Sequence, residues 1–440
     1  MDHIGLTSIV RELCLMPAAY NAILHFFRAE SWHNITVRCA WLRVLAKLPI
    51  LYRLDGRPVM VGDGVKESKE GRHMPGVKKL HQESENSAKG EHIFGHMFGG
   101  VGLLIGNLGQ KLYCVLTSLT LHDGLIAIHE WDQDESYKEE SHVVKTIKDA
   151  GKAAGILGSA ILLLDRLYLT VPMLKALAVE PLLQVVTKAK SNAAAFLDPK
   201  PKTGRGTKRK KGEKVRVSEF FQTKAEEFVT EAAYMYGKVQ AVSYYCIDLL
   251  WGKAWYQKLR FVLVILDGKE SILVSTDLTL TPVQIIELYC CRFKIECSFR
   301  ELKQVIAGFN YRFWSKFMPR LNRYKSNDEN QENLRTVTDE NAQAKIESTV
   351  RAIEGHVLLS HIALGLLQII SVMFADFFSN TTLRFMRTKS NTIPSESTVA
   401  DYMRKNINRL FRFFPDLAIT AIINDRQIGS DDWHEGDLAA

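Results

Sequence analysis

Between residues 53 and 197, hydrophobic and polar positions predict a run of strands interrupted by one helix. The stretch RPVMVGD alternates so that Val59, Val61 and Asp63 share one face of a strand, with the carboxylate at the end of an apolar row. The stretch SAILLL at 159–164 is apolar without alternation, as in a strand covered on both faces, and Asp165 ends it. The other predicted elements are strands at 93–104, 112–121 and 183–187 and a helix at about 135–153.

Residues 198–281 do not continue this order and predict a mostly β insertion. Its predicted strands lie at 238–249, 259–266 and 271–275. Thr281, Pro282 and Gln284 then predict a helix start, with a hydroxyl at the N-cap, proline at the first helical position and an amide two residues later. The spacing of apolar residues predicts that this helix continues to Lys303.

Both ends of the chain are predicted to be helical. Residues 321–343 are polar and predict a loop, and helices are expected from there to residue 424. The segment 357–375 is long and apolar enough to raise the question of a membrane span. Its polar residues cluster on one side, which favours a buried bundle helix instead.

Composition and charge are those of a folded protein with more than one core. The chain has 440 residues, of which 46% are hydrophobic and 24% charged, enough for two or three domains. Seven cysteines without CxxC spacing indicate a reducing compartment, and they argue against a disulfide framework and a zinc finger.

The formal net charge of +8 is unevenly placed. Residues 200–216 hold nine Lys or Arg against the single acid Glu213. Such a run is either a solvated linker or an arm that follows phosphates without reading sequence. The second interpretation makes Lys208, Arg209, Lys210 and Lys211 candidate phosphate-binding residues.

Four polar residues of the helix after Thr281 have the most informative spacing. At about 100° per residue, Tyr289, Arg292, Glu296 and Lys303 fall within an arc of roughly 60°. A carboxylate between two cations suits a site that holds a metal ion beside a phosphate. The simpler alternative is a surface helix with ordinary ion pairs.

The pattern Y-x2-R-x3-E-x6-K formed by these four motif residues resembles that of bacterial insertion-sequence transposases of the DDE type. The surrounding stretch VSTDLTLTPVQIIELYCCRFKIECSFRELKQ resembles that family as well. The resemblance covers roughly residues 57–320. It implies that Glu296 completes a catalytic triad with two upstream aspartates, and that Tyr289, Arg292 and Lys303 bind DNA phosphates.

The resemblance also implies a fold. It predicts an α/β protein with a ribonuclease H-like core, a mixed five-stranded sheet with flanking helices, interrupted by the β insertion. In that layout the strands ending at Asp63 and Asp165 lie side by side, so their carboxylates meet. The predicted units are a helical N-terminal region that could contact DNA ends (1–52), the first part of the core (53–197), the insertion (198–281), the catalytic-helix part of the core (282–320) and a helical C-terminal region (321–440).

Cofactors and partners follow from the same resemblance. Asp63, Asp165 and Glu296 would bind two Mg²⁺ ions, with Mn²⁺ as a substitute, and catalyse hydrolysis and transesterification of phosphodiesters. The partners would be double-stranded DNA, as terminal inverted repeats and target, and a second copy of the chain in a homodimer on DNA. The protein is expected in the cytoplasm, with the nucleoid and without a membrane.

Some alternatives remain open at this stage. The chain could be an inactive DNA-binding protein derived from a transposase, or a ribonuclease H-like structural nuclease. Asp123 and Asp277 compete as carboxylates, although the first lies in a His-Asp-Gly turn and the second precedes the capped helix. Trp251 and Trp255 in the insertion are candidates for stacking on a DNA base.

Overall fold

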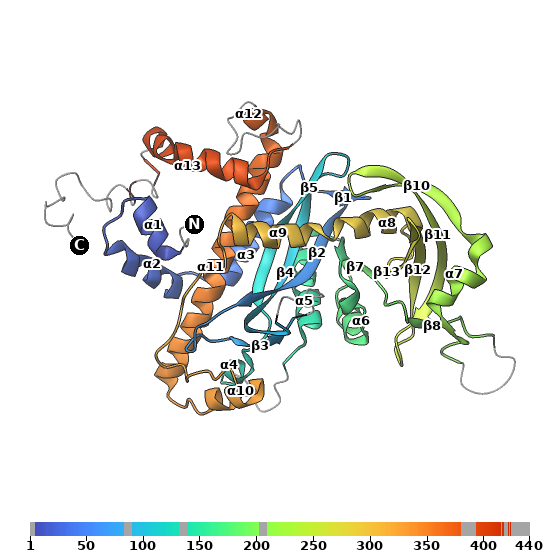
Figure 1. Ribbon diagram of the computed structural model, residues 1–440, viewed down its shortest axis with the longest axis horizontal. Coiled ribbons are helices and arrows are strands. Elements are labelled where there is room, and N and C mark those ends of the chain that lie inside the picture. The colour runs from blue at the N-terminus through green and yellow to red at the C-terminus, as the bar shows by residue number, and fades with distance from the viewer. Residues whose placement is uncertain are drawn as a thin grey trace.

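The centre of the protein is one large mixed sheet with helices on both faces. The computed structural model describes residues 5–82, 90–131, 139–201, 209–379 and 393–414, together with residues 416, 417, 421 and 423. In this part of the chain, thirteen strands are hydrogen-bonded into a single sheet. Figure 1 shows the strands of the insertion at one end of the molecule and the long helix α11 (Glu340–Met373) toward the other.

Five strands form the middle of the sheet in the order β5-β4-β2-β6-β7. They are β5 (Lys111–Leu121), β4 (His92–Asn107), β2 (Arg57–Ser68), β6 (Ala160–Leu163) and β7 (Leu183–Lys188). The pairs β5–β4 and β4–β2 are antiparallel, whereas β2–β6 and β6–β7 are parallel. This order and these directions are consistent with the predicted ribonuclease H-like layout. One detail was wrong, because β2 continues to Ser68 and Asp63 lies inside the strand instead of at its end.

The strands of the insertion extend the same sheet. Antiparallel to β7 lies β13 (Lys269–Ser275), followed by β12 (Gln257–Leu266) and β11 (Lys238–Trp251). These three strands overlap the predicted ones. The sequence pattern missed β10 (Val229–Met235), β8 (Ala194–Phe196) and β9 (Lys214–Arg216), which complete this end of the sheet.

Side chains of alternate residues in the central strands pack into two hydrophobic cores. Val59 and Val61 lie in the core beneath helices α8 (Pro282–Cys291), α9 (Lys294–Gln304) and α11. Met60 lies in the core beneath α5 (His142–Leu157) and α6 (Val171–Leu177). Ser141 caps the first turn of α5 with its side chain, and the earlier start predicted near residue 135 lies outside the described residues. Full burial of each such aliphatic side chain contributes roughly 1.5–3 kcal/mol.

The predicted single helix from Pro282 to Lys303 is wrong. The structure has two successive helices, α8 (Pro282–Cys291) and α9 (Lys294–Gln304). The predicted capping box at Thr281 and Gln284 is present. At the junction, the amides of Arg292 and Glu296 donate to carbonyls three residues earlier, which tightens the turn between the helices.

The remaining elements surround this core. They are α1 (Leu6–Glu12), α2 (Ala19–Arg28), α3 (Asn34–Ala46), β1 (Arg53–Leu54), β3 (Lys78–His81), α4 (Ile126–Glu130), α7 (Phe220–Thr223), α10 (Asn327–Arg335), α11 (Glu340–Met373), α12 (Ala375–Ser379) and α13 (Glu396–Phe413), with short 3-10 helices at Arg166–Tyr168, Val217–Glu219 and Ala225–Glu227. The prediction of a loop over 321–343 is wrong, because Ser326 and Glu329 form a capping box that starts α10.

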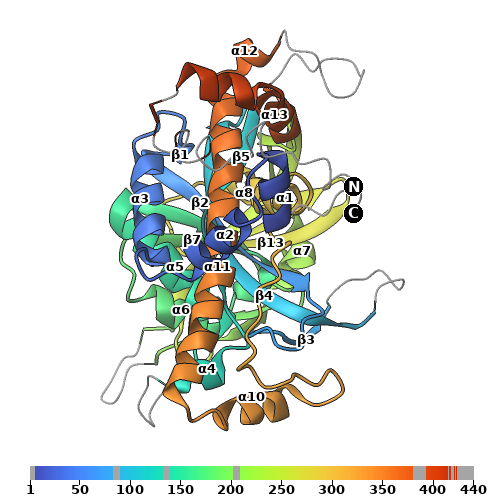
Figure 2. The same ribbon diagram turned by 90° about the vertical axis from the view of Figure 1, so that its left-hand side faces the viewer.

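Helix α11 is long and apolar enough to cross a membrane when judged by length and composition alone. In the structure its residues His361, Gln368 and Ser371 are buried, and Val357 and Leu364 belong to the core. Figure 2 shows it running along one side of the molecule with α2 against it. This position is the packing predicted for a bundle helix.

Candidate functional site

Two aspartates lie opposite each other at one edge of the central strands. The parallel ladder of β2 and β6 pairs Val59 with Ile161 and ends at Val61 and Leu163. Two residues further along each segment are Asp63 and Asp165, so the register brings them side by side although they come from distant parts of the sequence. One carboxylate oxygen of Asp63 accepts a hydrogen bond of 2.8 Å from the Gly64 amide.

The junction of α8 and α9 brings the third carboxylate to the same place. Arg292 lies in this junction, and its guanidinium donates to Asp63 Oδ2 at 3.1 Å through Nη1. Through Nη2 it donates to Glu296 Oε1. The side chain of Arg292 is only 15% exposed and that of Asp63 21%, whereas Glu296 is 41% exposed, so the pair with Asp63 is the more shielded from water. Arg292 therefore connects the carboxylate of β2 to the carboxylate of α9.

The electrostatics of this cluster reflect crowded negative charge. Burial raises the pKa of Asp63 to about 6, against the lowering effect of Arg292 and the Gly64 amide, and the nearby Glu296 and Asp165 carboxylates raise it further. Burial by itself would lower the pKa of Arg292, but Asp63, Glu296 and Asp165 raise it, so that it ends above its ordinary value. The fold thus places Asp63 where burial and the neighbouring carboxylates disfavour its ionised form.

This cost gives a prediction for the metal-free protein. The pKa of Asp63 in the folded state lies above its ordinary value of 3.8, so its contribution to stability is fully present below pH 3.8 and is lost as the pH rises through about 6. Asp63→Asn does not titrate and should be stabilised relative to wild type by up to about 3 kcal/mol at pH 7, and by much less at pH 4. Denaturant unfolding in EDTA at both pH values measures the difference.

The control is Asp123→Asn, the same change at a partly exposed carboxylate that pairs with Lys78 at 2.6 Å. It should show no such gain at pH 7. A difference between Asp63→Asn and wild type that is the same at pH 4 and pH 7 would contradict the electrostatic interpretation.

Lys303, the last motif residue, contacts β2 further along the strand than Arg292 does. Its Nζ atom pairs with Glu67 Oε2 at 2.8 Å and lies 3.4 Å from the carbonyl oxygen of Lys66. Asp63 and Glu67 are four residues apart on one strand face, so β2 presents one carboxylate to Arg292 and another to Lys303. Sequence reasoning missed Glu67, although its even spacing from Asp63 placed it on the same face.

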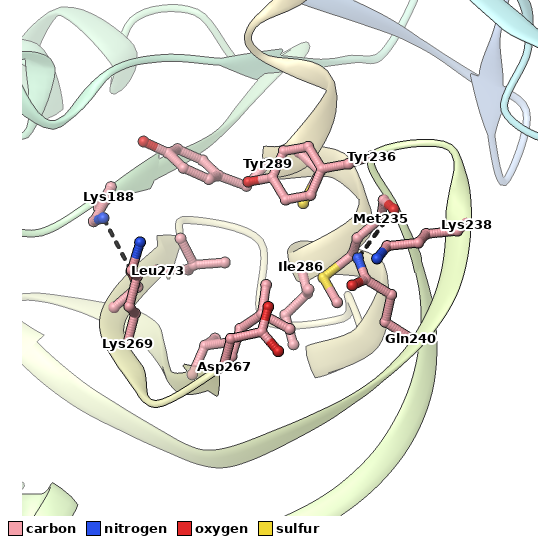
Figure 3. Close-up of a pocket in the computed structure, with 14 residues that line it drawn as sticks. Lys188, Met235, Tyr236, Lys238, Gln240, Asp267, Lys269, Leu273, Ile286 and Tyr289 are labelled. Atoms are coloured by element: carbon pink, nitrogen blue, oxygen red, sulfur yellow. Dashed lines mark hydrogen bonds between the residues drawn. The ribbon is translucent and has the colours of Figure 1, made fainter.

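Tyr289 lies between the carboxylates and a pocket of about 470 Å³ at the start of the insertion. Figure 3 shows Tyr289 and Tyr236 at one side of this pocket, with Lys188, Lys238 and Lys269 also around it. Burial raises the pKa of Tyr289, and the neighbouring Asp165 also raises it while Arg292 lowers it. The hydroxyl of Tyr289 therefore remains protonated at neutral pH.

Two hairpin turns supply the pocket's residues. The β10–β11 turn contains Tyr236 and the β12–β13 turn contains Asp267, both with positive φ. A left-handed conformation costs a tyrosine about 1–2 kcal/mol, and its side chain is 71% exposed. Each of these residues is followed by a glycine that also has positive φ, as in a two-residue type I′ hairpin turn. The sequence did not predict the pocket, because β10 was not recognised.

The basic run lies away from the carboxylates. It connects β8 and β9, and β8 pairs with β11 at Leu250, near the end of β11 opposite the Tyr236 turn. Lys211 lies 4.3 Å from the Phe196 ring centre, Arg209 and Lys210 are exposed, and Lys208 is outside the described residues. At about 3.3 Å per residue, the length of β11 puts this corner roughly 40 Å from the Tyr236 turn. Trp255 lies at the same distant turn.

A DNA-binding role for the run can still be tested by salt dependence. Arg209→Gln combined with Lys210→Gln should flatten the slope of log affinity against log salt concentration by about 2 if both cations contact phosphates. The matched control changes Lys152 and Lys175, exposed on α5 and α6, to Gln. Equal slopes for the two double variants and wild type would show that the run is a solvated linker.

The competing aspartates have structural partners. Asp277 pairs with Arg57 at 2.5 Å and accepts from the Thr279 amide at 2.8 Å. Asp123 pairs with Lys78 and accepts a hydrogen bond of 2.9 Å from the Gly124 amide. These contacts are those of turn residues that hold loops in place.

Whether the three carboxylates suit a metal ion depends on their chemistry and on Arg292. Carboxylate oxygens are the ligands that Mg²⁺ prefers. Among the described residues, no group of three His, Cys, Asp or Glu side chains is arranged to hold a metal ion. The guanidinium of Arg292 bridges Asp63 and Glu296 instead. The donor atoms are of the kind that a hard divalent cation takes, and in this structure Asp63 and Glu296 are bound by the guanidinium of Arg292.

Comparison with known protein families matches part of the chain. Residues 137–318 match the family model described as a transposase DDE domain, a range that includes Asp165 and all four motif residues but not Asp63. No curated protein matches the chain. The match supports the DDE transposase family, and with it a transposase that acts on DNA. Members of that family generally use divalent metals and are normally soluble and cytoplasmic.

Proposed function

We propose that this protein cleaves DNA at the ends of its own insertion sequence and joins the 3′ ends to target DNA. The observation that carries the proposal is the meeting of Asp63, Asp165 and Glu296, which come from three separate elements, around Arg292. Three carboxylates in one partly buried place repel one another, and such an unfavourable arrangement is typical of a functional site.

Asp63, Asp165 and Glu296 are the residues that would hold Mg²⁺, as two ions or with Mn²⁺ in its place. When bound, such ions neutralise charge on the scissile phosphodiester and activate the attacking oxygen, first of water and then of a DNA 3′ end. The protein's own contribution is to bring the three carboxylates together and align them before DNA arrives.

The motif cations would bind the phosphates on either side of the scissile bond. In the DNA-free structure Arg292 is paired with Asp63 and Glu296, and Lys303 is paired with Glu67. DNA binding would exchange these carboxylates for phosphate oxygens, which accept the same charge-assisted hydrogen bonds. Arg292 would become available when the carboxylates are neutralised by cations, so metal and DNA binding should reinforce each other.

The pocket extends this cationic surface toward the insertion. Lys188, Lys238 and Lys269 come from three different strands and lie next to Tyr289. A DNA strand leaving the carboxylates in this direction would meet three ammonium groups and two exposed or half-buried tyrosine rings. Such a combination suits a phosphate backbone with unstacked bases beside it.

The decisive experiment is a reaction on DNA that carries the inverted repeats flanking the gene. Purified protein, a labelled repeat-end duplex, a supercoiled target plasmid and Mg²⁺ should give cleavage at the repeat end and covalent joining of its 3′ strand to the plasmid. The controls are a scrambled duplex of equal length and the same reaction in EDTA.

The products separate the possible functions. End-specific cleavage followed by joining supports the transposase. Cleavage of both duplexes without joining indicates a nuclease, and tight binding to the repeat end without cleavage in Mg²⁺ or Mn²⁺ indicates a DNA-binding protein. Either of the last two results would overturn the proposal.

A further inference from the structure

A chain of polar side chains lies behind the two aspartates, on the opposite side of β2 from Arg292. The Tyr168 hydroxyl is 2.6 Å from His142 Nε2. His142 Nδ1 is in turn 2.7 Å from His122 Nδ1. Tyr168 is 3% exposed and His122 is 4% exposed, and His142 between them is half-buried.

Each member of the chain is attached to a segment that matters for the carboxylates. Tyr168 ends the 3-10 turn that begins at Arg166, directly after Asp165. His142 is the first residue of α5, and His122 follows β5. The Lys145 ammonium donates to the His122 carbonyl at 2.8 Å, which fixes His122 to α5 as well.

Two glycines make room for the imidazoles. Gly64 follows Asp63 directly and is paired in the ladder with Gly99 on β4. A Cβ atom on Gly64 would lie 3.0 Å from His142 Nε2, and one on Gly99 would lie 1.9 Å from His122 Cε1. A side chain on Gly99 would displace the His122 imidazole, and one on Gly64 would meet Met97 Cε at 2.4 Å and crowd His142, so the two glycines leave room for this pair.

The hydrogen bonds limit the protonation states of Tyr168, His142 and His122. A bond between two Nδ1 atoms requires one to donate and the other to accept, so the two rings cannot both be doubly protonated. Burial lowers the pKa of His142 to about 4 and that of His122 to about 2. Burial also raises the pKa of Tyr168, as does the nearby Asp63 carboxylate. The chain is therefore uncharged at neutral pH.

The backbone ladder does not reach the carboxylates. It ends at Val61 and Leu163, two residues before Asp63 and Asp165. Beyond that point the Thr187 hydroxyl donates to the Asp165 carbonyl at 2.9 Å, which ties Asp165 to β7 but not to β2. The imidazole of His142 packs on Gly64 of β2 and bonds the turn after Asp165, and so connects the two segments.

We propose that Tyr168 and His142 are positioning residues that set the separation of the Asp63 and Asp165 carboxylates. The inference rests on the proposed function, since the separation matters only if the two aspartates share cations. Hydrogen-bonded groups behind metal ligands typically change metal affinity or activity by about 10–100-fold when removed. Neither residue belongs to the four-residue motif, and neither contacts DNA in this proposal.

The test removes one hydroxyl group. Tyr168→Phe should weaken Mn²⁺ binding, followed by electron paramagnetic resonance without DNA, by about 10-fold or more, and should slow cleavage of the repeat end comparably. Binding of the same duplex in EDTA should stay within about 2-fold of wild type. The matched control is Tyr244→Phe, which removes a hydroxyl that donates to Glu231 at 2.7 Å in the insertion, and it should leave Mn²⁺ affinity unchanged.

A second pair of variants keeps the test decisive if Tyr168→Phe is unstable. The side-chain amide of Gln can take the place of imidazole Nε2, so His142→Gln should retain most of the Mn²⁺ affinity that His142→Leu loses. Wild-type Mn²⁺ affinity in both Tyr168→Phe and His142→Leu would overturn the positioning role. Failure of wild type itself to bind Mn²⁺ would instead reject the proposed metal site.

Discussion

Asp63→Asn, Asp165→Asn and Glu296→Gln should each lower the rate of DNA strand cleavage by about 10³-fold or more. Each change replaces an anionic oxygen ligand by an amide of nearly the same shape, so the packing around it is preserved. Binding of the repeat-end duplex should remain within about 3-fold of wild type, because the phosphate-binding cations are retained. The measurement is single-turnover cleavage of a labelled end in Mg²⁺, alongside affinity for the same end in EDTA.

Asp123→Asn provides the matched control for this series. Like Asp63, Asp123 accepts a hydrogen bond from the backbone amide of the glycine that follows it. Its ion-pair partner, however, is Lys78 and not Arg292. It should cleave like wild type. Efficient Mg²⁺-dependent cleavage by any one of the three triad variants would remove that residue from the proposed site.

Much of this site could be predicted from sequence because its parts are locally encoded. Asp63 and Asp165 follow apolar strand segments, whereas the side-by-side position of β2 and β6, which the structure shows as a parallel pair, was implied by the family resemblance. Thr281 and Gln284 set the start of α8 through contacts within one helical turn. The assignment of catalytic roles to these residues stays a prediction until the variants are measured.

The parts that escaped prediction depend on pairing between distant segments. The break at Arg292 was hidden because the apolar spacing continues across it, from Leu288 to Ile295, with both side chains buried. The tight turn there is made by backbone bonds to carbonyls three residues back, which leave no mark on composition. The interaction of Glu67 with Lys303 likewise needs the three-dimensional crossing of α9 over β2.

Strand register decided where the insertion's features lie. The turns at Tyr236 and Asp267 and the end of β7 at Lys188 come to one edge because β10–β13 alternate in direction. The same alternation sends Trp255 and the basic run to the other edge. A sequence pattern identifies strands but not their order, so the pocket was missed.

Arg292→Ala and Lys303→Ala should each weaken binding of a precleaved end in Ca²⁺ by about 1.5–3 kcal/mol, the range for hydrogen bonds to charged groups. Their effects on cation binding without DNA should differ. Arg292 competes for Asp63 and Glu296, so Arg292→Ala should bind Mn²⁺ more tightly than wild type. Lys303 pairs with Glu67, outside the triad, so Lys303→Ala should bind Mn²⁺ like wild type.

Two titrations on each variant separate these roles, one of end DNA in Ca²⁺ and one of Mn²⁺ in the absence of DNA. In wild type, Ca²⁺ should also tighten binding of the end, because neutralising the carboxylates makes Arg292 available to phosphate. In Arg292→Ala that coupling should shrink, whereas in Lys303→Ala it should persist. If both variants bind the precleaved end like wild type, Arg292 and Lys303 are only ion-pair partners that hold α8 and α9 against β2.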